Sequence, residues 1–149
     1  MAPADSAHNA IDRLISDHRR AWHGFEYVYP VVSRRSGGLS VGINLYIDAA
    51  CNFDCVYCQV DRPTGRRGDV DREKLRHELT TMIRSVMDGE IWSDPAFGQT
   101  PLTMRRFNDI AFSGDGEPTA HPAFADACEI VADLRQRLAL TTTRIVLIT

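Results

Sequence analysis

Apolar residues recur at two spacings along this 149-residue chain, and their alternation predicts its helices and strands. Spacings of three and four are typical of helices, and short continuous apolar runs are typical of buried strands. The predicted segments, in chain order, are a helix over residues 6–22, a strand over 39–47, a helix over 71–87, a strand over 107–114, a helix over 122–138 and a strand over 143–149.

Each predicted helix begins at a residue suited to a helix N-terminus. Asp5 or Ser6 can cap the first helix and Asp71 the second. Pro122 fits the first turn of the third, where a missing N–H costs nothing. The apolar faces are Ile11, Leu14, Ile15, His18 and Trp22 in the first helix, Leu75, Leu79, Met82, Ile83 and Val86 in the second, and Phe124, Cys128, Val131, Leu134 and Leu138 in the third.

The segments between these elements have turn and loop composition. Residues 27–38 are expected to be extended and to end at Gly37 and Gly38. Residues 61–70 form a polar loop rich in Gly, Pro and Arg, and residues 88–104 form an irregular connection. The order is therefore a helix followed by βαβαβ, which predicts an α/β fold with a parallel sheet and helical crossovers.

The last predicted strand has no helix after it in this sequence. A strand in a parallel sheet is normally covered on both faces. We therefore expect the chain to be the front part of a larger barrel-like domain, with an N-terminal helix and extension over residues 1–38 and the core over 39–149. The alternative is a small complete βαβαβ domain that pairs its last strand in a dimer.

Composition and charge exclude some classes of protein. Hydrophobic residues make up 44% and charged residues 25%, as in ordinary globular domains. The net charge of −3 argues against a domain that binds nucleic acid over its whole surface. The sequence has no signal peptide and no apolar run long enough to span a membrane. A cytoplasmic protein with reduced thiols and no membrane partner is the expectation.

Three cysteines stand close together after the first predicted strand. Cys51, Cys55 and Cys58 lie in the run CNFDCVYC, with spacing C-x3-C-x2-C. Three thiolates on one loop can hold a cubane iron–sulfur cluster and leave its fourth iron without a protein ligand. Catalytic metal sites keep such an open position, whereas structural sites close all of theirs.

Other uses of these cysteines are open from the residues alone. A zinc site usually takes four ligands, and no fourth is evident nearby, although a partner could supply one. Cys55 and Cys58 could form a redox pair, which leaves Cys51 as a spare thiol. Incidental core cysteines are the least favoured alternative, because three occur within eight residues on one loop.

A second motif follows the second predicted strand. It is the run Ser113, Gly114, Asp115, Gly116 and Glu117, followed by Pro118 and Thr119. In parallel α/β folds, ligands bind at the carboxyl ends of the strands, so this loop and the cysteine loop should open on the same edge. Glycines there allow a ligand to approach the backbone closely.

Together the two motifs resemble those of the radical SAM superfamily, with Tyr57 as the matching aromatic residue before the last cysteine. The resemblance implies a partial (β/α)6 TIM-like barrel, of which this chain would be the N-terminal half. Cys51, Cys55 and Cys58 would ligate a [4Fe–4S] cluster whose fourth iron chelates S-adenosylmethionine (SAM). Tyr57 would lie near the adenine. Ser113, Gly114, Asp115, Gly116 and Glu117 would bind the methionine amino group, with Asp115 standing where many members have Gly.

The family's chemistry is reductive cleavage of SAM to a 5′-deoxyadenosyl radical, which abstracts hydrogen from a substrate. The resemblance therefore implies an electron donor such as flavodoxin or ferredoxin. The stretch of residues 33–62 is similar to the branch that contains wybutosine-type enzymes, which implies transfer RNA as a partner. Radical installation on a protein, as in glycyl-radical activating enzymes, is a further alternative, as is a non-catalytic metal module or an inactive fragment.

The remaining candidate residues have simpler interpretations. The loop residues Arg62, Arg66 and Arg67 could touch phosphate, but neighbouring aspartates dilute their charge and favour a solvated loop. Cys128 lies on the apolar face of its predicted helix and is interpreted as a core thiol. His121 is expected to belong to the turn before that helix.

Overall fold

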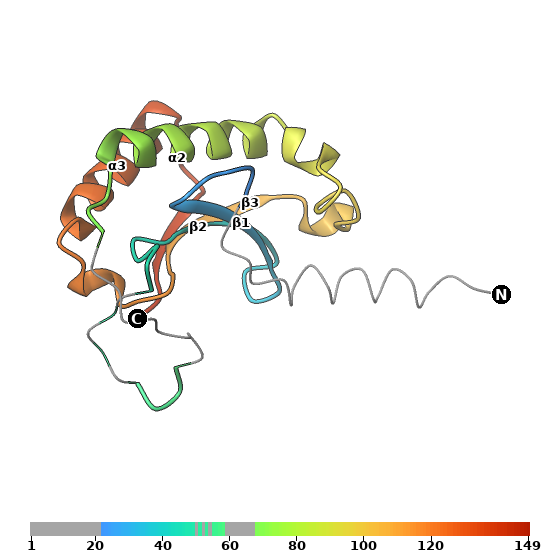
Figure 1. Cartoon of the computed structure of the whole chain (residues 1–149). Helices are drawn as coiled ribbons and strands as arrows, with labels where there is room; N and C mark the ends of the chain where they lie inside the picture. The colour runs from blue at the N-terminus through green and yellow to red at the C-terminus, as the bar shows by residue number, and fades with distance from the viewer. Residues whose placement is uncertain (1–21, 50, 52, 54, 59–67) are drawn as a thin grey trace.

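The computed structural model describes residues 22–149 except 50, 52, 54 and 59–67 (Figure 1). Its strands and helices are β1 (Val28–Ser33), β2 (Gly38–Ile43), α2 (Arg72–Met87), β3 (Phe107–Phe112), α3 (Phe124–Arg137) and β4 (Arg144–Leu147). Short 3-10 helices lie at Glu90–Ser93, Leu102–Met104 and Pro118–Ala120. The helix predicted over residues 6–22 falls almost wholly outside the described residues.

The strands form one mixed sheet in the order β1-β2-β3-β4. β2, β3 and β4 are parallel and are connected through α2 and α3, which confirms the predicted α/β fold. β1 is antiparallel to β2 and pairs with it from Val28 opposite Ile43 to Ser33 opposite Gly38. The expectation of a purely parallel sheet was therefore wrong at this edge. The boundary expected between residues 38 and 39 falls inside this hairpin.

The predicted second helix is confirmed in its bounds and its buried face. The Asp71 carboxylate accepts a hydrogen bond from the Lys74 N–H at 3.0 Å and so caps α2. All five predicted apolar side chains are buried: Leu75, Leu79, Met82, Ile83 and Val86. Helical spacing placed them on one stripe, and that stripe packs on the sheet.

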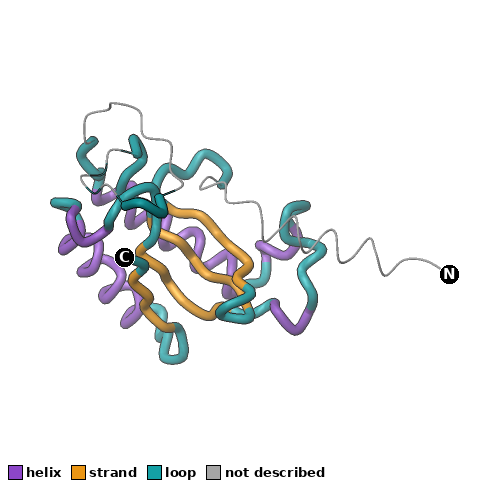
Figure 2. The backbone as a smooth tube through the Cα atoms, turned by 90° about the horizontal axis from the view of Figure 1, so that it is seen from below, coloured by secondary structure: helices purple, strands orange, loops and turns teal. Residues whose placement is uncertain are grey.

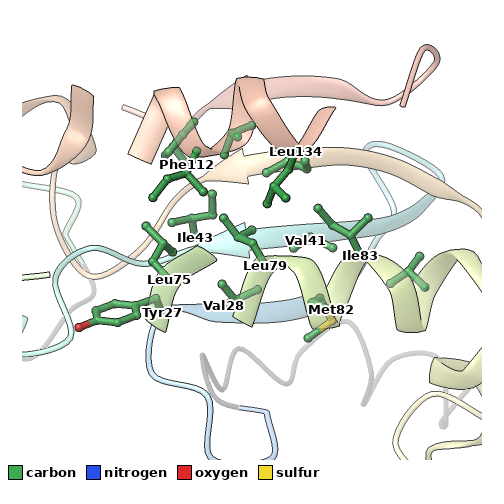
Figure 3. Packing of buried hydrophobic residues seen from close by; sticks show 14 of the residues in the cluster. Tyr27, Val28, Val41, Ile43, Leu75, Leu79, Met82, Ile83, Phe112 and Leu134 are labelled. Atoms are coloured by element: carbon green, nitrogen blue, oxygen red, sulfur yellow. The ribbon is translucent and has the colours of Figure 1, made fainter. Parts of the chain in front are cut away.

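Both helices lie on the same face of the sheet (Figure 1). Between them and the strands is a hydrophobic core, in which Val41, Ile43 and Phe112 meet Leu79 and other α2 side chains (Figure 3). α3 buries Ala127, Ile130, Val131 and Leu134. Phe124, Cys128 and Leu138, which were expected to be buried, are partly buried and pack against the core.

The parallel strands end earlier than predicted. β2 ends at Ile43 and not at residue 47, and β3 ends at Phe112 and not at residue 114. The Asn44 side chain accepts a hydrogen bond from the Tyr46 N–H at 3.0 Å, which turns the chain away from the sheet. Residues 44–50 therefore separate β2 from the cysteine loop, which does not follow the strand directly.

No helix of the described residues covers the opposite face of the sheet, and loops lie at both ends of the strands (Figure 2). Side chains alternate between the two faces, so Val41 and Ile110 enter the core whereas Gly42 and Ala111 face the other side. None of the helices in the described part of the chain is long and apolar enough to cross a membrane.

Candidate functional site

A cavity of about 610 Å³ opens on the face of the sheet opposite α2 and α3, at the carboxyl ends of β2 and β3. Its walls come from the cysteine loop, from the loop after β3, and from the strands beneath them. All nine residues that the sequence predicted as site residues line it: Cys51, Cys55, Tyr57, Cys58, Ser113, Gly114, Asp115, Gly116 and Glu117. The two motifs, which lie more than fifty residues apart in the chain, therefore face one space.

Cys51 joins the two motif loops directly. Its Sγ accepts hydrogen bonds from the Glu117 N–H at 3.3 Å and from the Phe53 N–H at 3.5 Å. Cys55 and Cys58 close a turn through a hydrogen bond from the Cys58 N–H to the Cys55 carbonyl at 2.9 Å. Cys51 and Cys55 are half-buried and Cys58 is exposed. Hydrogen bonds to the sulfurs are one of the features that tune iron–sulfur clusters held by cysteines.

The chemistry of this donor set fits an iron–sulfur cluster: three cysteine thiols line one cavity, and one of them already accepts N–H hydrogen bonds. The thiols are not drawn together, however. Within the described ranges, no three His, Cys, Asp or Glu side chains are arranged so that they could hold a metal ion. Metal binding commonly orders its own ligands, so a loop with suitable donors need not have them converged beforehand.

Asn44 holds the loop after β3 in place. Its Oδ1 accepts a hydrogen bond from the Asp115 N–H at 3.1 Å, and its Nδ2 donates to the Asp115 carboxylate at 2.7 Å. A Cβ on Gly114 would lie 2.2 Å from Asn44 Oδ1, so only glycine allows this approach. Asp115 is therefore tied to the turn after β2.

Tyr29 supports the start of the same loop from β1. Its hydroxyl lies 2.8 Å from Ser113 Oγ and 3.3 Å from the Ser113 carbonyl oxygen. The ring crosses directly over Gly42, where an added Cβ would be only 2.3 Å from the ring. Sequence reasoning missed Tyr29, Gly42 and Asn44. The only available signals were a glycine inside a strand and a polar residue at the end of an apolar run.

Tyr57 lies on the outer wall of the cavity. Its side chain is 77% exposed, and its hydrogen bond with Cys55 raises its pKa above the ordinary tyrosine value. Phe53 and Val56 are exposed on the same loop. The loop therefore exposes apolar side chains between its cysteines.

His121 and Cys128, which were also singled out from the sequence, are not part of the cavity lining. His121 is buried in the turn before α3, where its Nδ1 accepts from the Ala123 N–H at 3.1 Å and its ring meets Tyr46 edge-on, as expected of a turn residue. Cys128 packs against the core, and burial raises the pKa of its thiol. Arg62, Arg66 and Arg67 lie outside the described residues.

Comparison with known proteins finds distant relatives. No family model and no solved structure matches the chain. A UPF0026 protein of Methanocaldococcus jannaschii is 30% identical over 113 residues, which are 76% of this chain and 31% of that protein. The GTPase Obg of Brachyspira hyodysenteriae is 23% identical over 107 residues, 72% of this chain and 13% of that protein. The chain thus matches a third or less of the length of these relatives.

The similarity to a GTPase does not include a phosphate-binding loop of the G-x-x-x-x-G-K-[ST] type. Such a loop requires a lysine directly after a glycine. Lys74 is the only lysine of the chain and follows Glu73. The chain is therefore similar in sequence to that GTPase but lacks this phosphate-binding motif.

Proposed function

We propose that this chain is the cluster- and SAM-binding part of a radical SAM enzyme. One observation carries the proposal: both motifs line the same cavity, and the Glu117 N–H of one donates to the Cys51 sulfur of the other. Cysteines that served only packing would have no reason to share an open cavity with a glycine-rich loop at the strand ends.

Some residues would bind the cofactors, and others would hold those binding residues in position. Cys51, Cys55 and Cys58 would hold a [4Fe–4S] cluster, and Ser113–Glu117 would bind the amino end of SAM. The chemistry that a reduced cluster supplies when bound is one-electron cleavage of the SAM C5′–S bond. Asn44 and Tyr29 fix the loop after β3 through the Asp115 and Ser113 hydrogen bonds, so the binding groups are in place before SAM arrives.

The topology supports the front half of a (β/α)6 barrel as the architecture. β2, β3 and β4 follow one another in space, each parallel to the last, with α2 and α3 on the outer face. The apolar side chains Ile145 and Leu147 of β4 are exposed, as expected for a strand that further helices and strands cover in a longer protein. The relatives named above are indeed longer than the matched region.

Transfer RNA is the substrate class proposed for the whole enzyme, from the likeness of residues 33–62 to the wybutosine branch. An electron donor of the flavodoxin or ferredoxin type would then serve the cluster. Binding of transfer RNA that weakens steeply with salt would support this substrate class. A specific complex with a protein substrate would instead favour a glycyl-radical activating role.

The test is low-temperature EPR on the anaerobically reconstituted chain, reduced with dithionite, with and without SAM. A [4Fe–4S] signal that changes shape when SAM is added is the expected result, because SAM would bind the open iron. Cys51→Ala, Cys55→Ala and Cys58→Ala should each lose the signal and the bound iron and sulfide. Cys128→Ala is the matched control, because that thiol packs against the core and should leave the cluster unchanged.

Two outcomes would contradict the proposal. Full retention of iron and sulfide in all three loop variants would show that these cysteines do not hold the cluster. Colourless protein with stoichiometric zinc, after anaerobic purification, would point to a non-catalytic metal module.

A further inference from the structure

A polar pair that the cluster and SAM do not use lies at the floor of the cavity: Ser40 lines the cavity, and Asp109 is hydrogen-bonded to Ser40 without being part of the lining. Ser40 and Gly42 of β2 and Ala111 of β3 line the cavity from below. Asp109 lies two residues before Ala111 and so faces the same side of the sheet. The Ser40 hydroxyl donates a hydrogen bond to its carboxylate.

Asp109 is a buried carboxylate with little to compensate it. Its side chain is only 4% exposed. Within the part of the chain that the structure describes, the Ser40 hydroxyl is the sole hydrogen-bond donor to the carboxylate, and no Arg, Lys or His forms an ion pair with it. Arg144, the residue of β4 that pairs with Asp109 in the sheet register, is exposed and forms no ion pair with it.

Burying a carboxylate with a single hydrogen-bond donor costs free energy unless a ligand supplies the missing donors or a positive charge. A buried carboxylate is normally offset by a cation or by two or three N–H donors, because removing the charge from water costs several kcal/mol. Glu78 shows the usual solution in this protein, since its carboxylate accepts three backbone N–H bonds, from Glu26, Tyr27 and Val28. Asp109 has no comparable set and stands beside an open cavity.

We propose that Ser40 and Asp109 form a substrate-positioning subsite for a positively charged N–H group, an ammonium or an amidinium, at the cavity floor. The group would enter where Ser40 opens onto the cavity and donate hydrogen bonds to the Asp109 carboxylate. Seated there, a substrate would lie on the strands beneath the loops proposed to hold the cluster and SAM. The substrate role rests on the proposed function, whereas binding of the cationic group does not.

The experiment is calorimetric titration of the full, anaerobically reconstituted chain with benzamidine, compared with benzamide, its neutral analogue of nearly the same shape. Wild-type protein should bind benzamidine in preference to benzamide. Asp109→Asn should weaken benzamidine binding by at least about tenfold, because it removes the charge and keeps the shape. Ser40→Ala should keep binding within about threefold, since the carboxylate remains.

Asp88→Asn is the matched control, because it removes the same charge from an exposed residue at the end of α2. Equal benzamidine affinity in the Asp109→Asn and Asp88→Asn variants would overturn the inference and place the ligand at Asp115 or Glu117 instead. Wild-type protein that binds benzamide and benzamidine with equal affinity would also overturn the inference, whether or not Asp109→Asn folds. Melting curves of each variant accompany the titrations.

EPR on the same samples separates this inference from the proposed function. A cluster that responds to SAM, in a protein that shows no preference for benzamidine, would contradict the subsite and leave the proposed function standing. Benzamidine binding that depends on Asp109, in a protein that forms no cluster, would contradict the radical SAM proposal and support the cation site on the sheet.

Discussion

Gly42 is a residue outside the two motifs at which one added methyl group should disturb the candidate site. Its missing side chain leaves room for the Tyr29 ring, which reaches over β2 to Ser113. In Gly42→Ala, the new Cβ would lie 2.3 Å from that ring, so the ring must move and its hydrogen bond to Ser113 must break. We expect a loss of about 1–3 kcal/mol in the free energy of unfolding, measured by urea denaturation.

Gly68→Ala is the control for this substitution. No atom lies within 4 Å of a Cβ built on Gly68, so the added methyl group meets open space. Its effect should be within about 0.5 kcal/mol of zero, or slightly stabilising through the unfolded state. Equal stability of the two variants would mean that the Tyr29 ring repacks freely and does not fix the loop after β3.

Between elements, several ion pairs link the two helices, and the one at Asp133 gives a prediction about pH. The Arg76 guanidinium of α2 contacts the Asp133 carboxylate of α3, and Arg137 contacts it at 2.7 Å from within α3. Hydrogen bonds from Arg76 and Arg137 hold the pKa of Asp133 below its ordinary value, although partial burial opposes the shift. A lowered carboxyl pKa contributes stability that is present above the ordinary value and is lost as the pH falls through the folded one.

Asp133→Asn should therefore lower the melting temperature slightly at pH 7, and the difference should shrink as the pH falls below about 4. The effect is expected to be small because both partners are partly exposed. Asp88→Asn, at an exposed residue that forms no ion pair with the described residues, should show no such pH dependence. A difference in melting temperature that persists unchanged to low pH would indicate lost packing and not a lost charge interaction.

The elements that sequence could predict are those whose pattern is local. The α2 face from Leu75 to Val86 follows from helical spacing, and its start follows from Asp71, because a cap is a contact between near neighbours. The end of β2 could not be predicted in this way. Leu45 and Tyr46 are buried like strand residues, but the Asn44 side chain turns the chain before them.

The candidate site likewise has residues that local sequence patterns predict and residues that they do not. Its cysteines and glycines are recognisable as motifs, because metal binding and close backbone approach restrict residue type and spacing. Tyr29, Asn44 and Asp109 reach the site only through the sheet register, which places residues from distant parts of the chain side by side. Strand β1 was missed as part of the sheet for the same reason, since its pairing with β2 is a tertiary contact.

For the molecule as a whole, the outer edge of β4 is the most exposed apolar feature of the sheet. Ile145 and Leu147 are 46% and 44% exposed, although their register partners Ile110 and Phe112 are buried beneath the helices. β4 pairs with β3 alone among the described strands, so its other edge presents free backbone N–H and C=O groups beside these side chains. Such an edge is a template for pairing with another chain.

We therefore expect the 149-residue chain on its own to self-associate with rising concentration, as measured by sedimentation velocity. Leu147→Lys should shift the distribution toward monomer, because a charge on an edge strand opposes strand pairing. Leu102→Lys is the matched control: Leu102 is more exposed, at 80%, but lies in a 3-10 helix with no strand edge. If both lysines reduce association equally, general surface hydrophobicity and not the open edge drives it. If the wild-type chain stays monomeric throughout, the β4 edge needs no further strand, and the proposed barrel loses its main physical support.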